Sequence, residues 1–117
     1  MNVQVFGFKD CQDTRKALRF FSERRIKTHF VDLKERAASK GELRRFVERH
    51  GVDAIIDRSS KRLAALGLQR AFYGPDRWLE ILAEEPLLLR TPLVRFGQKV
   101  TIGSAEDVWK EWVDAEK

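Results

Sequence analysis

One stretch near the N-terminus, residues 3–15, constrains the fold more than any other part of the chain. The apolar residues from Val3 to Phe8 are spaced as in a short strand, and a polar turn follows them. From Gln12 the apolar residues take up helical spacing. The only cysteine, Cys11, is therefore expected where a strand passes into the first turn of a helix.

This position bears on the chemistry of the Cys11 thiol. The first N–H groups of a helix have no partner within the helix, and the helix dipole is positive at that end. A thiolate is stabilised there, so we expect a pKa below that of a free thiol. Lys9, Arg15 and Lys16 add positive charge nearby, which two aspartates oppose. Two interpretations remain open: a reactive nucleophile, or the buried and inert cysteine that is common in small domains.

The charges of the chain are mixed rather than clustered. Its 117 residues, 43% of them hydrophobic, suit a single domain with one core. Lysine and arginine exceed aspartate and glutamate by 23 to 18, but no long run of like charge occurs. We interpret most of these residues as solvated helix faces, which permits an anionic partner and gives no reason to expect nucleic-acid binding.

The cellular location is inferred from what the sequence lacks. One cysteine cannot form an internal disulfide, which fits a reducing compartment. No apolar run is long enough to span a membrane, and the N-terminus has no basic segment followed by an apolar one. We expect a cytoplasmic protein without a membrane partner.

The first half of the chain predicts a βαβ unit followed by helices. A helix over residues 12–25 and a strand over residues 26–33 complete a strand–helix–strand unit, which favours parallel pairing. Ser39 and Glu42 have the spacing of a capping box, and that helix is expected to end at Gly51. A further short helix is expected around Gly67.

The second half predicts a helix, a hairpin and a last helix. Gly74 begins a turn and cap that open a helix ending before Pro86. Strands over 93–96 and 99–102 are expected to pair as an antiparallel hairpin. The last helix is expected from about Ala105, burying Val108, Trp109, Trp112 and Val113. The order fits an α/β fold, with a small mixed sheet packed against helices.

Several local motifs, taken in order, resemble the ArsC/Spx family of arsenate reductase-like proteins over nearly the whole chain. The motifs that carry the resemblance are Lys9-Asp10-Cys11, Arg15-Lys16-Ala17, Phe30-Val31-Asp32-Leu33, Glu42-Leu43, Ala65-Leu66-Gly67-Leu68, and Pro86 with the run from Leu87 to Val94. The resemblance implies a single thioredoxin-like domain over 1–117, β-α-β … β-β-α. Residues 1–38 and 86–117 would form its core and residues 39–85 an all-helical insertion.

The resemblance also implies a nucleophilic thiol at Cys11. In the arsenate reductases the matching cysteine attacks the oxyanion, arginines hold that anion, and glutathione with glutaredoxin completes the reduction. Arg58 falls where the arginine of the insertion belongs. Thr91 stands where the family has an arginine before its proline, with Arg90 one residue earlier. Arg90 or Arg95 is a candidate substitute.

The motif around the cysteine separates two branches of the family. The Spx branch, which binds RNA polymerase, often has a second cysteine where this chain has Thr14. The single cysteine looks more like the branch proposed to act as glutathione-dependent thiol reductases. The expected partners are glutathione, as co-substrate rather than bound cofactor, or glutaredoxin, with an oxyanion or disulfide substrate. RNA polymerase is the alternative partner.

Other residues have a functional and an ordinary interpretation. In the resembled fold Pro92 follows a cis peptide bond and the Thr91 backbone binds substrate; otherwise Pro92 opens an edge strand. Arg58, with Arg15 and Arg90, is a candidate anion ligand, or Arg58 pairs on the surface with Asp57 or Glu48.

The Thr14 hydroxyl either donates to the Cys11 thiolate or belongs to an ordinary first-turn residue. His29 and His50 are expected on the surface, without a metal. Trp78, Trp109 and Trp112 are expected in the core.

Overall fold

The computed structural model describes residues 1–116 and divides the chain into two compact units. The first comprises residues 1–32 together with the segment that begins at Thr91, and the second comprises residues 33–90. Each unit is described by itself. Within the described part of the chain, no helix has both the length and the apolar character needed to cross a bilayer.

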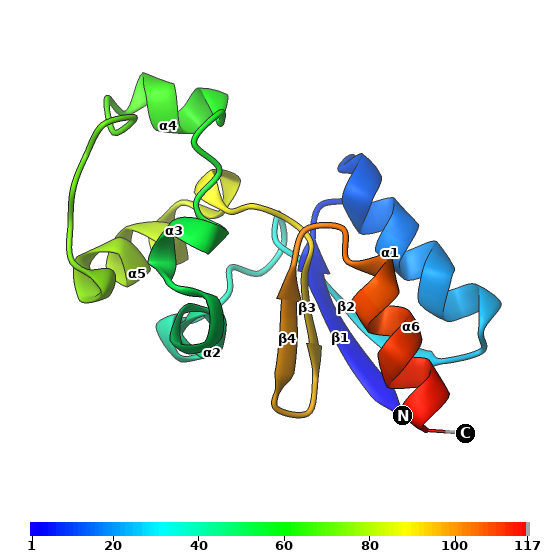
Figure 1. Ribbon diagram of the computed structural model, residues 1–117. Coiled ribbons are helices and arrows are strands. Elements are labelled where there is room, and N and C mark those ends of the chain that lie inside the picture. The colour runs from blue at the N-terminus through cyan, green and yellow to red at the C-terminus, as the bar shows by residue number, and fades with distance from the viewer. Residues whose placement is uncertain (117) are drawn as a thin grey trace. The chain divides into compact units, whose positions relative to one another are not determined.

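The first unit is built on a four-stranded mixed sheet (Figure 1). Its strands are β1 (Asn2–Gly7), β2 (Lys27–Asp32), β3 (Leu93–Phe96) and β4 (Lys99–Ile102), in the order β2-β1-β3-β4. The β1–β2 pair is parallel, and the β1–β3 and β3–β4 pairs are antiparallel. These pairings confirm the expected parallel βαβ unit and the antiparallel hairpin.

Two helices, α1 (Gln12–Glu23) and α6 (Glu106–Ala115), cover the same face of this sheet (Figure 1). Their apolar stripes meet the strands in one cluster: Val3, Val5, Ala17, Phe20, Phe21, Val94, Trp109, Trp112 and Val113. The Trp109 indole also donates a 2.7 Å hydrogen bond to the buried Thr101 hydroxyl, so its one polar group is satisfied. The α/β fold expected from the sequence, a small mixed sheet packed against helices, is confirmed.

The second unit is helical, with α2 (Lys40–His50), α3 (Val52–Ile55), α4 (Lys61–Ala65), α5 (Pro75–Glu84) and the short 3₁₀ helix η1 (Pro86–Leu88). Trp78 of α5 is 1% exposed in its core. A bidentate pair, in which Arg62 donates to both carboxylate oxygens of Glu85 at 2.9 and 2.8 Å, ties α4 to the end of α5. An isolated bridge between Ile56 and Leu89 joins the two ends of the unit.

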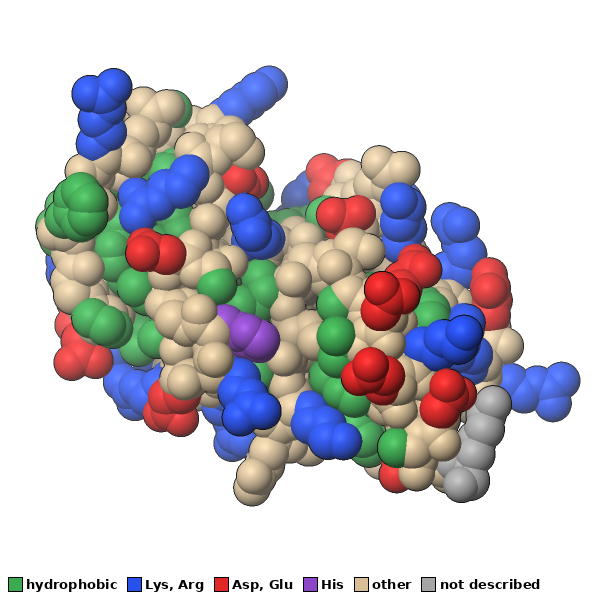
Figure 2. Space-filling view, in the orientation of Figure 1, with side chains coloured by type: hydrophobic (Ala, Val, Ile, Leu, Met, Phe, Trp, Pro, Cys, Tyr) green, Lys and Arg blue, Asp and Glu red, His purple; other side chains and the backbone are tan. Residues whose placement is uncertain are grey.

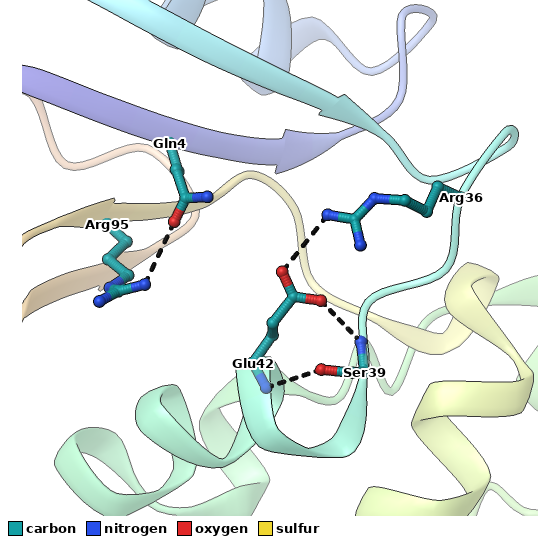
Figure 3. A network of polar contacts seen from close by, with 5 residues as sticks. All are labelled: Gln4, Arg36, Ser39, Glu42 and Arg95. Atoms are coloured by element: carbon teal, nitrogen blue, oxygen red, sulfur yellow. Dashed lines mark hydrogen bonds and ion pairs between the residues drawn. The ribbon is translucent and has the colours of Figure 1, made fainter.

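The capping box expected at the start of α2 is present (Figure 3). The Glu42 N–H donates to Ser39 Oγ at 3.1 Å, and the Ser39 N–H donates to Glu42 Oε1 at 3.0 Å. The helix stops at Gly51, whose φ of 85° few other residues adopt. In the first unit, the same figure shows Arg95 Nη1 donating to Gln4 Oε1 at 3.3 Å across β1 and β3.

Two expectations about local structure were wrong. The short helix expected around Gly67 is α4, which ends at Ala65, because Gly67 has a φ of 71° that breaks the helix. Val108, expected in the core, is 38% exposed. The stripe of α6 that meets the sheet runs through Trp109, Trp112 and Val113, and Val108 lies about 100° around the helix from Trp109.

The charged residues follow the mixed pattern of the sequence. On the face drawn in Figure 2, lysine and arginine side chains lie among aspartates and glutamates. Several are paired within their own unit, as in the Lys40–Glu80 and Arg77–Glu80 contacts at 3.8 and 3.0 Å. Exposed pairs of this kind contribute little to stability.

Candidate functional site

Cys11 occupies the N-cap of α1, directly after the turn that ends β1. Its N–H donates to the Phe8 carbonyl at 3.0 Å, which closes the turn, and its carbonyl accepts the first helical bond from the Arg15 N–H at 3.0 Å. The side chain is partly buried. The structure therefore places the thiol at the positive end of α1, as the sequence predicts.

Thr91 meets the sulfur from a distant part of the sequence. The Thr91 hydroxyl donates to Cys11 Sγ at 3.3 Å, across 80 positions of the chain. The Thr91 carbonyl lies 3.9 Å from the same sulfur and can accept from the thiol. The Thr91–Pro92 peptide bond is cis, and the Gly103 N–H donates to the Pro92 carbonyl at 2.8 Å. The segment before β3 is thus held against the first turn of α1.

Thr14, the third residue of α1, presents a buried hydroxyl beside the cysteine. Its side chain is fully buried, and Oγ1 has no partner at hydrogen-bond distance. The same hydroxyl nevertheless acts on the pKa of Cys11 as a hydrogen-bond donor. The structure thus shows no hydrogen bond from this hydroxyl to the thiol, while its influence on the pKa is that of a donor to the thiolate.

The pKa of Cys11 reflects opposing influences. Burial of the sulfur acts to raise the pKa and is the largest single one. Four hydrogen-bond donors act against it: the hydroxyls of Thr14 and Thr91, and the backbone N–H groups of Thr14 and Asp13. Together these donors outweigh burial, so the pKa of Cys11 is lowered from its ordinary value.

Hydrogen-bond donors, rather than neighbouring cations, therefore lower the pKa. The sequence suggested Lys9, Arg15 and Lys16 as sources of stabilising charge. Lys9 instead lies 3.8 Å from the Asp32 carboxylate, and Arg15 Nη1 donates to the Lys9 carbonyl at 3.0 Å. Arg15 thereby holds the turn next to the cysteine, with its side chain exposed.

The other candidate anion ligands, Arg58 and Arg90, belong to the second unit. Arg58 pairs with Asp53 at 3.3 Å, donates to the Gln69 carbonyl at 3.3 Å, and has its guanidinium carbon 5.2 Å from the Trp78 ring centroid. The sequence offered Asp57 or Glu48 as its ion-pair partner, and this was wrong. The Arg90 side chain is exposed.

The two histidines are exposed and the three tryptophans are buried, as the sequence predicts. His29 and His50 are exposed, and among residues 1–116 no cluster of three or more His, Cys, Asp or Glu side chains is arranged to hold a metal. The three tryptophans are buried.

One contact of the site, that of the Thr91 side chain with the Cys11 sulfur, has no direct sign in the sequence. The expectation for Thr91 concerned its backbone, and the structure adds its hydroxyl as a donor to Cys11. No local pattern marks this role, because the two residues are far apart in the sequence.

Comparison with known proteins gives consistent matches. The model of the ArsC family matches residues 6–112. The protein YusI of Bacillus subtilis (strain 168) is 30% identical over 115 residues, covering 95% of this chain and 98% of that protein. "Global transcriptional regulator Spx 2" of Oceanobacillus iheyensis is 28% identical over 109 residues, covering 92% and 80%.

Among solved structures, an arsenate reductase from Vibrio cholerae superposes with a TM-score of 0.83 at 22% identity. The match covers 95% of this chain and 97% of that one. At this identity the likeness establishes the fold. It confirms the expected mixed α/β, thioredoxin-like architecture.

Proposed function

This chain belongs to the ArsC family, and on that premise we propose that it is a thiol-dependent oxidoreductase with Cys11 as nucleophile and glutathione, directly or through glutaredoxin, as external reductant. The observation that carries the proposal is the Cys11 sulfur at the N-cap of α1, contacted by the Thr91 hydroxyl at 3.3 Å and with a lowered pKa. A lowered pKa increases the thiolate fraction near neutral pH, and the thiolate is the attacking species.

With a disulfide substrate, the Cys11 thiolate attacks one sulfur, a mixed disulfide forms, and the other sulfur leaves as a thiolate that takes up a proton. The chain has no second cysteine to resolve this intermediate. A glutathione thiolate therefore attacks the substrate-side sulfur and releases Cys11. A second glutathione completes the reduction, so each substrate disulfide oxidises two glutathiones to glutathione disulfide. Glutathione is consumed as co-substrate, and we place the reaction in the cytoplasm, where thiols are kept reduced.

An oxyanion such as arsenate is the second substrate class. The thiolate would displace water from arsenic, and glutathione would then form a mixed disulfide with Cys11 as arsenic(V) becomes arsenic(III). Cys11 and this glutathione supply the two electrons, and a second glutathione, directly or through glutaredoxin, then reduces the mixed disulfide and frees Cys11, so each arsenate oxidises two glutathiones to glutathione disulfide. Arg15, which lies in the same unit as Cys11, is the proposed ligand of the anion. Thr91 replaces an arginine of the family pattern, which leads us to favour a disulfide.

The test compares wild-type protein with Cys11→Ser. Reduction of hydroxyethyl disulfide by glutathione, and of arsenate by glutathione with glutaredoxin, are measured in parallel. We expect wild-type turnover in at least one assay and only the uncatalysed background with Cys11→Ser. Ser104→Ala, which changes an exposed side chain before α6, is the matched control and should retain wild-type activity. Full activity in Cys11→Ser would overturn the proposal.

The similarity to an Spx regulator supports a second candidate, a non-enzymatic protein that binds RNA polymerase, with glutathionylation of Cys11 as a switch. The oxidoreductase requires the Cys11 thiol for turnover, whereas the regulator requires it only as a switch. Purified RNA polymerase is passed over immobilised protein, once reduced and once glutathionylated. Retention of the polymerase in one state supports the regulator, and no retention in either state contradicts it.

A further inference from the structure

Gly7 is the last residue of β1, paired with Asp32 of the parallel neighbour β2. Glycine weakens a strand, because it has no side chain to pack and loses more backbone freedom on folding. In residues 1–116, the glycines with positive φ are Gly51, Gly67, Gly97 and Gly103, and Gly7 is not among them. Its backbone conformation therefore does not require glycine.

What Gly7 provides is the space left by its missing Cβ. A Cβ built at this position would overlap Thr14 Oγ1 and would lie 2.7 Å from Cγ2 and 3.1 Å from Cβ of the same residue. Thr14 is fully buried, so it has no solvent-facing space into which it can turn. Any larger residue at position 7 would displace the Thr14 side chain.

We infer that Gly7 is a positioning residue for the reactive thiol: the space above its Cα seats the Thr14 hydroxyl beside Cys11, where it can donate to the thiolate. The buried Oγ1 without a partner is the independent observation that points to this use, because a hydroxyl held only for packing would be costly there. The inference rests on the proposed nucleophilic role of Cys11.

The experiment measures the alkylation rate of Cys11 by iodoacetamide against pH. The variants are Gly7→Ala, Thr14→Ala and the double variant. Gly41→Ala is the control, since a Cβ there meets only Ser39 Oγ at 3.9 Å. A role in packing alone would change stability and leave the titration midpoint unchanged. We expect Gly7→Ala and Thr14→Ala each to raise the midpoint by about one pH unit, as for the loss of one hydrogen bond to a charged group.

The double variant separates positioning from other effects. Once Thr14 is truncated, Gly7→Ala should not raise the midpoint further, because the two nearest contacts are gone and a small shift relieves the 3.1 Å contact with Thr14 Cβ. If Gly7→Ala alone does not fold, Thr14→Ala should restore folding in the double variant, with the midpoint of Thr14→Ala. Failure to restore it would overturn the inference.

The outcomes also separate this inference from the proposed function. A raised midpoint in Thr14→Ala with a wild-type midpoint in Gly7→Ala would overturn the role of Gly7 alone. The same is true if Gly7→Ala raises the midpoint further in the Thr14→Ala background. A wild-type midpoint in both single variants would show that the Thr14 hydroxyl does not lower the pKa of Cys11, and this would overturn the inference. The proposed nucleophilic role of Cys11 would be unaffected, because it is tested separately by the activity of Cys11→Ser.

Discussion

Two helices of this molecule begin with similar backbone geometry and different capping chemistry. The N-cap residues of α2 and α1, Ser39 and Cys11, both have extended φ and ψ, of −73° and 162° and of −82° and 121°. At α2 the box of Ser39 and Glu42 satisfies two orphan N–H groups (Figure 3). At α1 the sulfur makes no capping hydrogen bond, and the third residue, Thr14, has a hydroxyl without a partner.

The difference in capping indicates that the two helix N-termini have different roles. The cap of α2 is complete in the resting protein and contributes to stability. The cap of α1 is incomplete while the sulfur is neutral, and the donors around it favour a negative charge. We interpret α1 as a helix whose N-terminus is completed by the thiolate itself, which links the reactivity of Cys11 to the stability of the fold.

The largest effect on stability is expected at α2. Ser39→Ala removes the acceptor of the Glu42 N–H and should cost about 1 kcal/mol of unfolding free energy. Cys11→Ala, measured below the pH at which the Cys11 thiol ionises in the folded protein, should cost clearly less, because the neutral thiol makes no capping bond. Urea denaturation of both variants measures the difference, with Ser104→Ala as the exposed-serine control. Equal losses would mean that the two caps do not differ.

An effect of opposite sign is expected from Thr14→Val. Below the pH at which the Cys11 thiol ionises in the folded protein, the variant should gain up to about 1 kcal/mol, because a buried hydroxyl without a partner is replaced by a methyl group of the same shape. At neutral pH its Cys11 should be alkylated more slowly than in wild type, because one donor to the thiolate is lost. Urea denaturation and alkylation kinetics measure the two effects. A loss of stability below the pH at which Cys11 ionises would show that the hydroxyl is already bonded in the thiol form.

The smallest effect is expected from Arg15→Ala. The side chain is exposed and makes one hydrogen bond to the Lys9 carbonyl. Its loss should cost less than about 0.5 kcal/mol, as is usual for surface substitutions. Arg44→Ala, at an exposed position of α2, is the matched control in the same urea experiment. A markedly larger loss in Arg15→Ala would mean that the turn before α1 depends on this one contact.

Much of the fold could be predicted because its determinants are local. The alternation in β1 and β2, the spacing of Ser39 and Glu42, and the stop at Gly51 each lie within a few residues. The register of the last helix was harder. Val108 is apolar and adjacent to the stripe, but only the packing of α6 on the sheet shows that it faces solvent.

The candidate site likewise contains features that the sequence predicts locally and features that depend on tertiary structure. Cys11 and Thr14 lie within one helical turn and could be proposed from the sequence, whereas the contact with Thr91 depends on tertiary structure. The ion-pair partner of Arg58 could not be predicted from the sequence, because the neighbouring Asp57 carboxylate is already bonded to Ser59. Asp57 accepts from the N–H and hydroxyl of Ser59 at 3.0 and 2.7 Å, and Arg58 pairs with Asp53.

The central claim, that Cys11 caps α1 as a thiolate, is tested most directly by the unfolding free energy of wild type and Cys11→Ala as a function of pH. Between the lowered pKa of the folded thiol and the unfolded value of about 8.5, the native state has released a proton that the unfolded state still binds. The stability of wild type relative to Cys11→Ala should therefore rise with pH through this range and level off above it. The added stability should disappear as the pH falls through the folded pKa. A difference that stays constant, or that falls as the pH rises, would contradict the account.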